Sequence, residues 1–257
     1  MKIKQRLMTL ALLAFALQFA IIHAAAQSPK PTIVIVHGAW GGAWAFRKVD
    51  AELRAKGYNV YRPQLTGLGD RVHLARPDVG LNTHIEDVVN TILFEDLHDI
   101  VLVGHSYGGM VITGVADRVP DRIRKLIYVD ALVPNDGESL MSIFGDRNEF
   151  LKKMIKGDYI VPPWVKPDQP LPHDEPQPLK TFTEPIVLKN QTARKLPATY
   201  ILTVEKGKEP KDDDFYSQSR RAKDRNWPVV QLVADHNPQW SATESFVEML
   251  DRVAGGN

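Results

Sequence analysis

The segment Gly104-His105-Ser106-Tyr107-Gly108 places a serine between two glycines, directly after the apolar run 101–103. A helix-compatible stretch follows from Met110 to Arg118, and Pro120 ends it. Strand, sharp turn and helix in this order are typical of a nucleophile elbow, where the serine hydroxyl projects above a sheet edge. The glycines fit this interpretation because a strained serine leaves little room for side chains two positions away. We therefore predict a nucleophile at Ser106; the alternative is a tight glycine turn with an incidental serine.

A serine becomes a good nucleophile only when a base takes its proton, so the elbow predicts a histidine later in the chain. His236 directly follows the last apolar run, 229–233, where a loop returns to the carboxyl edge of the sheet. We expect His236 to be that base. The side chain of His105 is expected to point away from the cleft, and His37 to support the loop that follows the first strand.

An acid must then hold the histidine tautomer and stabilise the imidazolium. Asp130 stands alone at the end of the buried run 123–129, where an unpaired carboxylate would be costly. Glu205 follows the run 199–204 but begins a charged cluster, which is more typical of a solvated face. We prefer Asp130, and Glu205 stays open as the alternative.

Two backbone amides should meet the negative oxygen that forms when an ester carbonyl is attacked. One belongs to Tyr107, just after the nucleophile. The other belongs to Ala39, in the glycine-rich turn 37–42 after the first strand. These two N–H groups are the predicted oxyanion hole.

The composition fits a globular chain: 257 residues, 44% hydrophobic and 25% charged, with a net charge of +1. So small a charge gives no reason to expect nucleic acid or an anionic membrane as a partner.

Residues 1–26 hold three basic residues, an apolar run and Ala24-Ala25-Ala26, a pattern typical of a cleaved secretory signal peptide. An uncleaved anchor is the alternative. We expect export to a bacterial periplasm or beyond, without stable membrane association after cleavage; the absence of cysteine removes any need for disulfides.

Strand and helix patterns alternate over residues 27–257, which predicts one α/β domain with a mostly parallel sheet covered by helices. The strands are expected at 31–36, 58–61, 101–103, 123–129, 199–204 and 229–233. Residues 131–197 interrupt this order with many prolines and no strand pattern, and we interpret them as an inserted lid. Its large apolar side chains could line a pocket: Met141, Phe144, Phe150, Met154 and Trp164.

Several segments together resemble the α/β-hydrolase superfamily, in particular its branch of plant methylesterases, hydroxynitrile lyases and bacterial carboxylesterases. They are His37-Gly38-Ala39-Trp40-Gly41-Gly42-Ala43-Trp44, Gly104-His105-Ser106-Tyr107-Gly108-Gly109, Tyr128-Val129-Asp130-Ala131-Leu132-Val133-Pro134 and Asp235-His236. The resemblance implies an eight-stranded sheet with the lid between strands 6 and 7, and serine hydrolysis without a cofactor or metal. It implies that Ser106 is the nucleophile, that His236 is the base, and that the N–H groups of Ala39 and Tyr107 form the oxyanion hole. Many relatives place an aspartate after the strand matching 199–204, where this chain has Val204-Glu205-Lys206.

Hydrolysis of a small or medium-sized carboxylic ester through an acyl-enzyme on Ser106 is the function that these residues favour. Export favours an environmental or xenobiotic ester as the small-molecule substrate. A hydroxynitrile lyase of this branch tends to carry a lysine after the histidine and a threonine before the oxyanion residue; this chain has Asn237 and Gly38 there. The third possibility is a hydrolase-fold protein that binds a ligand without turning it over.

Overall fold

A parallel sheet of six strands carries the predicted site residues at its carboxyl edge. The strand order is β2-β1-β3-β4-β8-β9, and each neighbouring pair is parallel. The strands are β1 (Ile33–Val36), β2 (Val60–Tyr61), β3 (Ile100–His105), β4 (Ile123–Val129), β8 (Ala198–Val204) and β9 (Val229–Val233). Because parallel strands end at the same side, the loops that follow β1, β3, β4 and β9 can bring side chains together there.

The computed structural model describes residues 30–145, 148–166 and 168–255. The predicted signal peptide, residues 1–26, lies outside them. None of the helices within the described residues combines the length and apolarity needed to cross a bilayer.

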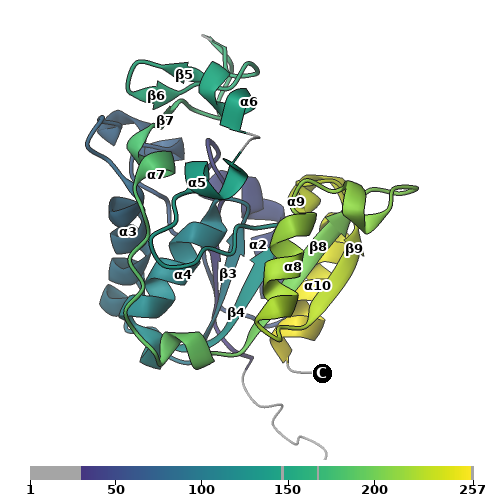
Figure 1. The fold of residues 1–257 in the computed structure, drawn as a ribbon. Helices are drawn as coiled ribbons and strands as arrows, with labels where there is room; N and C mark the ends of the chain where they lie inside the picture. The colour runs from purple at the N-terminus through teal and green to yellow at the C-terminus, as the bar shows by residue number, and fades with distance from the viewer. Residues whose placement is uncertain (1–29, 146–147, 167, 256–257) are drawn as a thin grey trace, which may run out of the picture. The chain divides into compact units, whose positions relative to one another are not determined.

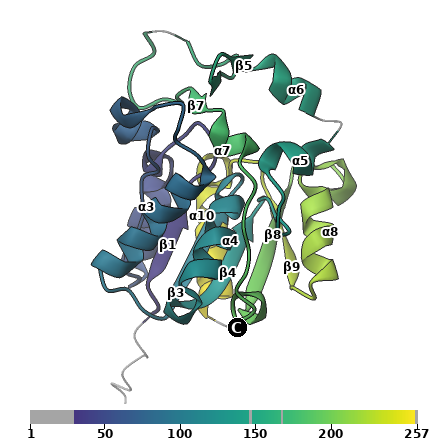
Figure 2. The ribbon, with the colours of Figure 1, turned by 60° about the vertical axis from the view of Figure 1, so that its left-hand side comes forward.

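Helices cover both faces of the sheet, as Figures 1 and 2 show. The main ones are α2 (Arg47–Ala55), α3 (Leu81–Phe94), α4 (Gly108–Arg118), α8 (Tyr216–Asp224), α9 (Pro238–Ser241) and α10 (Thr243–Gly255), and short 3-10 helices lie at Ala43–Phe46, Gly69–Leu74, Pro120–Arg122, Ala193–Lys195 and Pro210–Asp212. Alternate residues of β1 face opposite layers: Ile33 and Ile35 belong to the apolar cluster with α2 and α10, whereas Val34 and Val36 pack with α3 and α4. This two-sided burial explains why the central strands are continuous apolar runs.

The number of strands corrects one expectation. All six strand-like runs in the sequence form strands, but the sheet within the described residues has six strands and not eight. The number eight was implied by the family resemblance and not by a count of strand-like runs in the sequence. The insertion follows the strand 123–129 and precedes the strand 199–204, as expected; in the six-stranded sheet these are β4 and β8, the fourth and fifth strands in chain order.

The insertion, residues 131–197, also contains strands that the sequence did not suggest. Its elements are α5 (Leu140–Phe144), α6 (Asn148–Lys153), β5 (Ile155–Lys156), β6 (Tyr159–Ile160), β7 (Gln177–Pro178) and α7 (Lys180–Thr183). The three two-residue strands form a small antiparallel sheet. Strands this short, one ending in a proline, leave no alternating pattern to detect.

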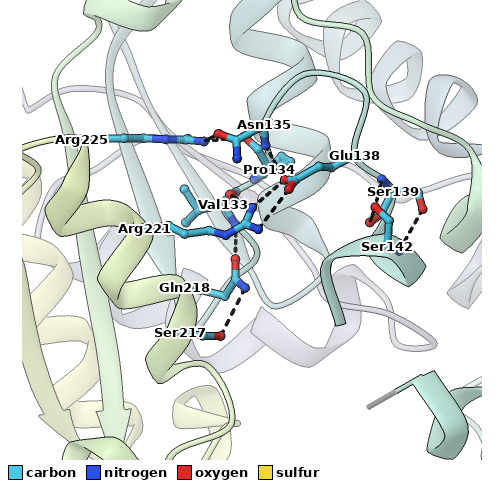
Figure 3. A network of polar contacts seen from close by, with 10 residues as sticks. All are labelled: Val133, Pro134, Asn135, Glu138, Ser139, Ser142, Ser217, Gln218, Arg221 and Arg225. Carbon is cyan, nitrogen blue, oxygen red and sulfur yellow. Dashed lines mark hydrogen bonds and ion pairs between the residues drawn. The ribbon is translucent and has the colours of Figure 1, made fainter. Parts of the chain in front are cut away.

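The beginning of the insertion is fastened to α8 by side-chain contacts (Figure 3). Arg221 forms two hydrogen bonds to the carboxylate of Glu138, of 2.5 and 3.0 Å. Gln218 Oε1 accepts a hydrogen bond from the Val133 N–H at 3.0 Å, and Arg225 donates to the Pro134 carbonyl at 2.6 Å. The chain that leaves the sheet after Asp130 is thereby held to a core helix.

Candidate active site

Ser106 lies in the turn between β3 and α4 with a left-handed φ of 54°. A side chain at position 104 would place its Cβ 2.7 Å from the Gly108 carbonyl oxygen. At position 108 the Cβ would lie 2.6 Å from the Val36 carbonyl oxygen. Only glycine fits such close backbone contacts, so the two flanking glycines make the serine turn possible.

The structure brings Ser106, His236 and Asp130 together. Ser106 Oγ lies 3.0 Å from His236 Nε2, and His236 Nδ1 lies 2.7 Å from Asp130 Oδ2. Since a carboxylate accepts, we assign the proton of the imidazole to Nδ1, which leaves Nε2 free to accept from the serine hydroxyl. The three groups form a hydroxyl–imidazole–carboxylate chain suited to serine activation.

Asp130 is held from two further sides. Its side chain is fully buried, and Oδ1 accepts a hydrogen bond from the Thr203 N–H in β8 at 3.2 Å. Its own N–H donates to the Ile201 carbonyl at 2.8 Å. The carboxylate is therefore fixed by the neighbouring strand of the sheet.

Glu205, the alternative acid, lies elsewhere. Its side chain is 51% exposed and pairs with Lys208 at 2.5 Å. The carboxylate that contacts the imidazole is thus the one at the end of β4, and the one after β8 is turned to solvent.

Two rings enclose the imidazole of His236. Phe215 stacks on it almost in parallel, with centroids 4.6 Å apart and an interplanar angle of 11°, and the His105 ring lies at 4.9 Å. His105 Nε2 also lies 2.7 Å from the His236 carbonyl oxygen, so His105 supports the backbone of the base. Burial lowers the pKa of His105 to about 3, which keeps this imidazole neutral with Nε2–H as the donor. No local pattern in the sequence predicted the stacking of Phe215 on His236.

The loop carrying Ala39 is held by the insertion. Trp40 has a left-handed φ of 61°; its N–H donates to Gln177 Oε1 at 2.8 Å, and its carbonyl accepts from the Glu175 N–H at 2.8 Å. Gln177 is fully buried in β7. Within the described residues, neither the Ala39 nor the Tyr107 N–H donates a hydrogen bond, so both remain available to a ligand. Gln177 was missed because its partner is 137 residues away.

His37 supports the same loop through hydrogen bonds of its ring, as expected. Its Nε2 accepts from the Leu65 N–H at 3.3 Å, and its Nδ1 lies 2.9 Å from the Gly38 carbonyl oxygen. Burial lowers its pKa to about 4, so the ring is neutral and can play both roles.

Two cavities meet at Ser106 and His236. The first, which we call the phenylalanine chamber, has a volume of 510 Å³. The second, the indole chamber, has a volume of 460 Å³. Of the expected pocket residues, Phe144 and Phe150 line the first and Trp164 the second, whereas Met141 and Met154 line neither. A larger cavity of 960 Å³ lies along α2 and β2, and Ser106 and His236 are not part of its lining.

Within the described residues, no group of three or more His, Asp or Glu side chains is arranged to hold a metal ion.

A parallel sheet with a strained serine after β3 and a histidine after its last strand defines a hydrolase of the α/β class. The alpha/beta hydrolase family model matches residues 33–249, and the chain belongs to that family.

Relatives that are named for their activities support the same branch. A carbendazim hydrolyzing esterase from Nocardioides is 56% identical over 43% of this chain and 46% of that protein. A pyrethroid hydrolase from Sphingobium wenxiniae is 27% identical over 85% of both. Two Arabidopsis thaliana methylesterases match at 32% and 30% identity, over 48% and 44% of this chain and 36% and 44% of theirs. The chain thus aligns with less than half the length of most of these relatives.

The solved structures agree on the fold. An extracellular α/β-hydrolase from a Paenibacillus species superposes with a TM-score of 0.73 at 23% identity, over 86% of this chain and 98% of that one. The expected superfamily and its methylesterase branch are confirmed.

Proposed function

We propose that this α/β hydrolase cleaves carboxylic esters through an acyl-enzyme on Ser106. The observation that carries the proposal is the continuous chain from Ser106 Oγ through His236 to Asp130, with contacts of 3.0 and 2.7 Å. The esterase and hydrolase names of the relatives support the ester as the bond that is cleaved.

In the first half-reaction, Ser106 Oγ attacks the ester carbonyl carbon while His236 Nε2 takes its proton. The carbonyl π electrons move to oxygen, which the N–H groups of Ala39 and Tyr107 stabilise. Asp130 stabilises the imidazolium. When the tetrahedral intermediate collapses, the carbon–oxygen bond to the alcohol breaks, and His236 gives its proton to the departing oxygen.

In the second half-reaction, His236 takes a proton from water as the water oxygen attacks the acyl-enzyme. The bond to Ser106 Oγ breaks, the proton returns to this oxygen, and the acid leaves. Chamber volumes of 510 and 460 Å³ suit a small or medium-sized ester with one half on each side of the serine. Carbendazim and pyrethroids, on which the relatives act by name, are the first candidates to assay.

Reaction with p-nitrophenyl acetate tests the proposal. The wild type should release a burst of p-nitrophenolate equal to the enzyme concentration, and mass spectrometry should find one acetyl group on the peptide holding Ser106. The Ser106→Ala variant should lose both signals. Retention of turnover by a folded Ser106→Ala variant would contradict the mechanism.

We also infer that residues 1–26 direct export and are removed, because their basic, apolar and small-residue segments follow the signal-peptide order. The N-terminal mass of protein purified from the periplasm or medium checks this. A mature chain beginning at Gln27 is expected, and retention of Met1 in that protein would exclude cleavage.

A further inference from the structure

The two chambers beside Ser106 differ in chemistry. The phenylalanine chamber is lined mainly by apolar side chains, which are Leu132, Leu140, Phe144, Phe150, Phe182 and Phe215, and the carboxylates Glu149 and Asp214 also belong to its lining. The indole chamber is lined by rings and polar groups: Trp164, Asp174, Asn237, Gln239 and Trp240. Ala39, Trp40, Ser106 and His236 belong to both. An ester attacked by Ser106 would therefore place its two halves in unlike surroundings.

Asp174 is the charged group of the indole chamber. Its half-buried carboxylate accepts one hydrogen bond through Oδ2, from Trp164 Nε1 at 2.8 Å. Oδ1 is directed toward the turn after β1, because a Cβ at Gly41 would lie 3.5 Å from it. Within the described residues, this oxygen accepts no hydrogen bond. Burial raises the pKa of Asp174, which reflects the cost of an incompletely solvated carboxylate. An N–H donor from a ligand would offset that cost.

Two indoles add a flat surface to this chamber. The Trp164 and Trp240 residues are 45% and 53% exposed, although tryptophan is a residue that folding usually covers. Trp164 meets Trp40 edge-on at 5.5 Å, and Trp240 stacks on Trp44 at 5.8 Å, so both are held in place. Exposed, fixed aromatic rings suit a planar group, which stacks with little loss of conformational entropy.

We propose that the substrate is an ester of two unlike halves: an apolar half in the phenylalanine chamber, and a planar half in the indole chamber whose N–H group donates to Asp174 Oδ1. This inference rests on the proposed ester hydrolysis and adds the recognition of an N–H donor. Asp174 is then a specificity-determining residue, and it takes no part in proton transfer at the serine.

Two matched pairs of esters test the proposal. One pair is 3-acetamidophenyl butyrate and its N-methyl counterpart, which carry the N–H group in the alcohol half. The other is butyl 3-acetamidobenzoate and its N-methyl counterpart, which carry it in the acyl half. In at least one pair, kcat/KM of the wild type should favour the N–H ester by roughly tenfold, as expected for a hydrogen bond to a charged group.

The Asp174→Leu variant should bring that ratio close to one, and Asp174→Asn should reduce it partly. Asp158→Asn, an exposed carboxylate in the same insertion, is the matched control and should keep the wild-type ratio. A ratio near one in both wild-type pairs, or one that Asp174→Leu leaves unchanged, would overturn the proposal. Loss of all turnover in Ser106→Ala tests ester hydrolysis separately, so failure of the N–H recognition, with turnover kept, is distinguished from failure of the hydrolysis itself.

Discussion

The sheet edge and the insertion contribute to the same site but are held in different ways. Ser106 and Asp130 follow β3 and β4, whose residues are almost all buried, and backbone contacts of the sheet fix both. Trp40, next to Ala39, is instead held by Gln177 and Glu175 from a segment with little regular structure. The nucleophile and acid thus depend on the core, whereas the oxyanion loop depends on a few long-range hydrogen bonds. Changes in the two regions should therefore have different consequences.

The largest effect is expected from Asp130→Asn at the sheet edge. The asparagine oxygen can still accept from the Thr203 N–H, but its amide would donate to His236 Nδ1 and leave the proton on Nε2. In that tautomer the imidazole cannot accept from Ser106. By analogy with serine proteases, kcat should fall about 10⁴-fold.

Glu205→Gln is the matched control and should keep kcat within about twofold, because its side chain faces solvent. Steady-state kinetics and thermal unfolding of both variants separate catalysis from folding. A large loss of kcat in Glu205→Gln, with Asp130→Asn active, would show that the acid is not the buried one.

A smaller effect is expected from Gln177→Leu in the insertion. The substitution leaves the Trp40 N–H without its acceptor and frees the loop that carries the Ala39 N–H. Because the oxyanion interaction is strongest in the transition state, kcat should fall about 10- to 100-fold with little change in KM. Steady-state kinetics on a small ester measures this.

Gln191→Leu, at an exposed position of the same insertion, should behave as the wild type. If Gln177→Leu raised KM and left kcat unchanged, the contact would serve substrate binding and not the oxyanion loop.

This contrast also explains which features could be predicted from the sequence. Short-range patterns predicted the strands, the Ser106 turn and the positions of Asp130 and His236 after strand ends, because glycine spacing and apolar runs are local. The contact of Gln177 with Trp40 and the stacking of Phe215 on His236 join segments far apart in the sequence and leave no such pattern. The catalytic and oxyanion roles of the five predicted residues stay predictions until they are measured.

The loop after β8 contains Asp213, whose effect on the free energy of unfolding should depend on pH. Burial and the nearby charge of Asp130 raise the pKa of Asp213 to about 6. Since the folded state binds this proton more tightly than the unfolded chain, Asp213 favours folding at low pH and loses that contribution as the pH rises through about 6. Asp213→Asn should therefore increase the free energy of unfolding by about 1 kcal/mol at pH 8, a value reduced for partial exposure.

At pH 4 the variant should differ much less from the wild type in its free energy of unfolding, because the folded wild type then carries a neutral group at position 213. Urea titrations at the two pH values measure this difference. Asp224→Asn, an exposed carboxylate on α8, should show no such dependence on pH. If Asp213→Asn increased the free energy of unfolding equally at both pH values, the charge of Asp213 would not be what destabilises the folded loop.

The smallest effect is expected where the two regions are joined, at Arg221 and Glu138 (Figure 3). Burial acts to raise the pKa of Glu138, but hydrogen bonds from Arg221 and the Asn135 N–H outweigh it and lower this pKa. The pair should thus stabilise the fold above the ordinary glutamate pKa and lose this contribution as the pH falls below it. A double-mutant cycle of Arg221→Gln and Glu138→Gln, followed by urea unfolding at pH 7, should give a coupling of about 0.5 kcal/mol. Because Asp130 is held by β8 independently of this pair, kcat should change less than in Gln177→Leu.

A coupling near zero would mean that the Arg221–Glu138 pair does not stabilise the start of the insertion. A larger loss of kcat than in Gln177→Leu would mean that the start of the insertion and the sheet edge are not held separately.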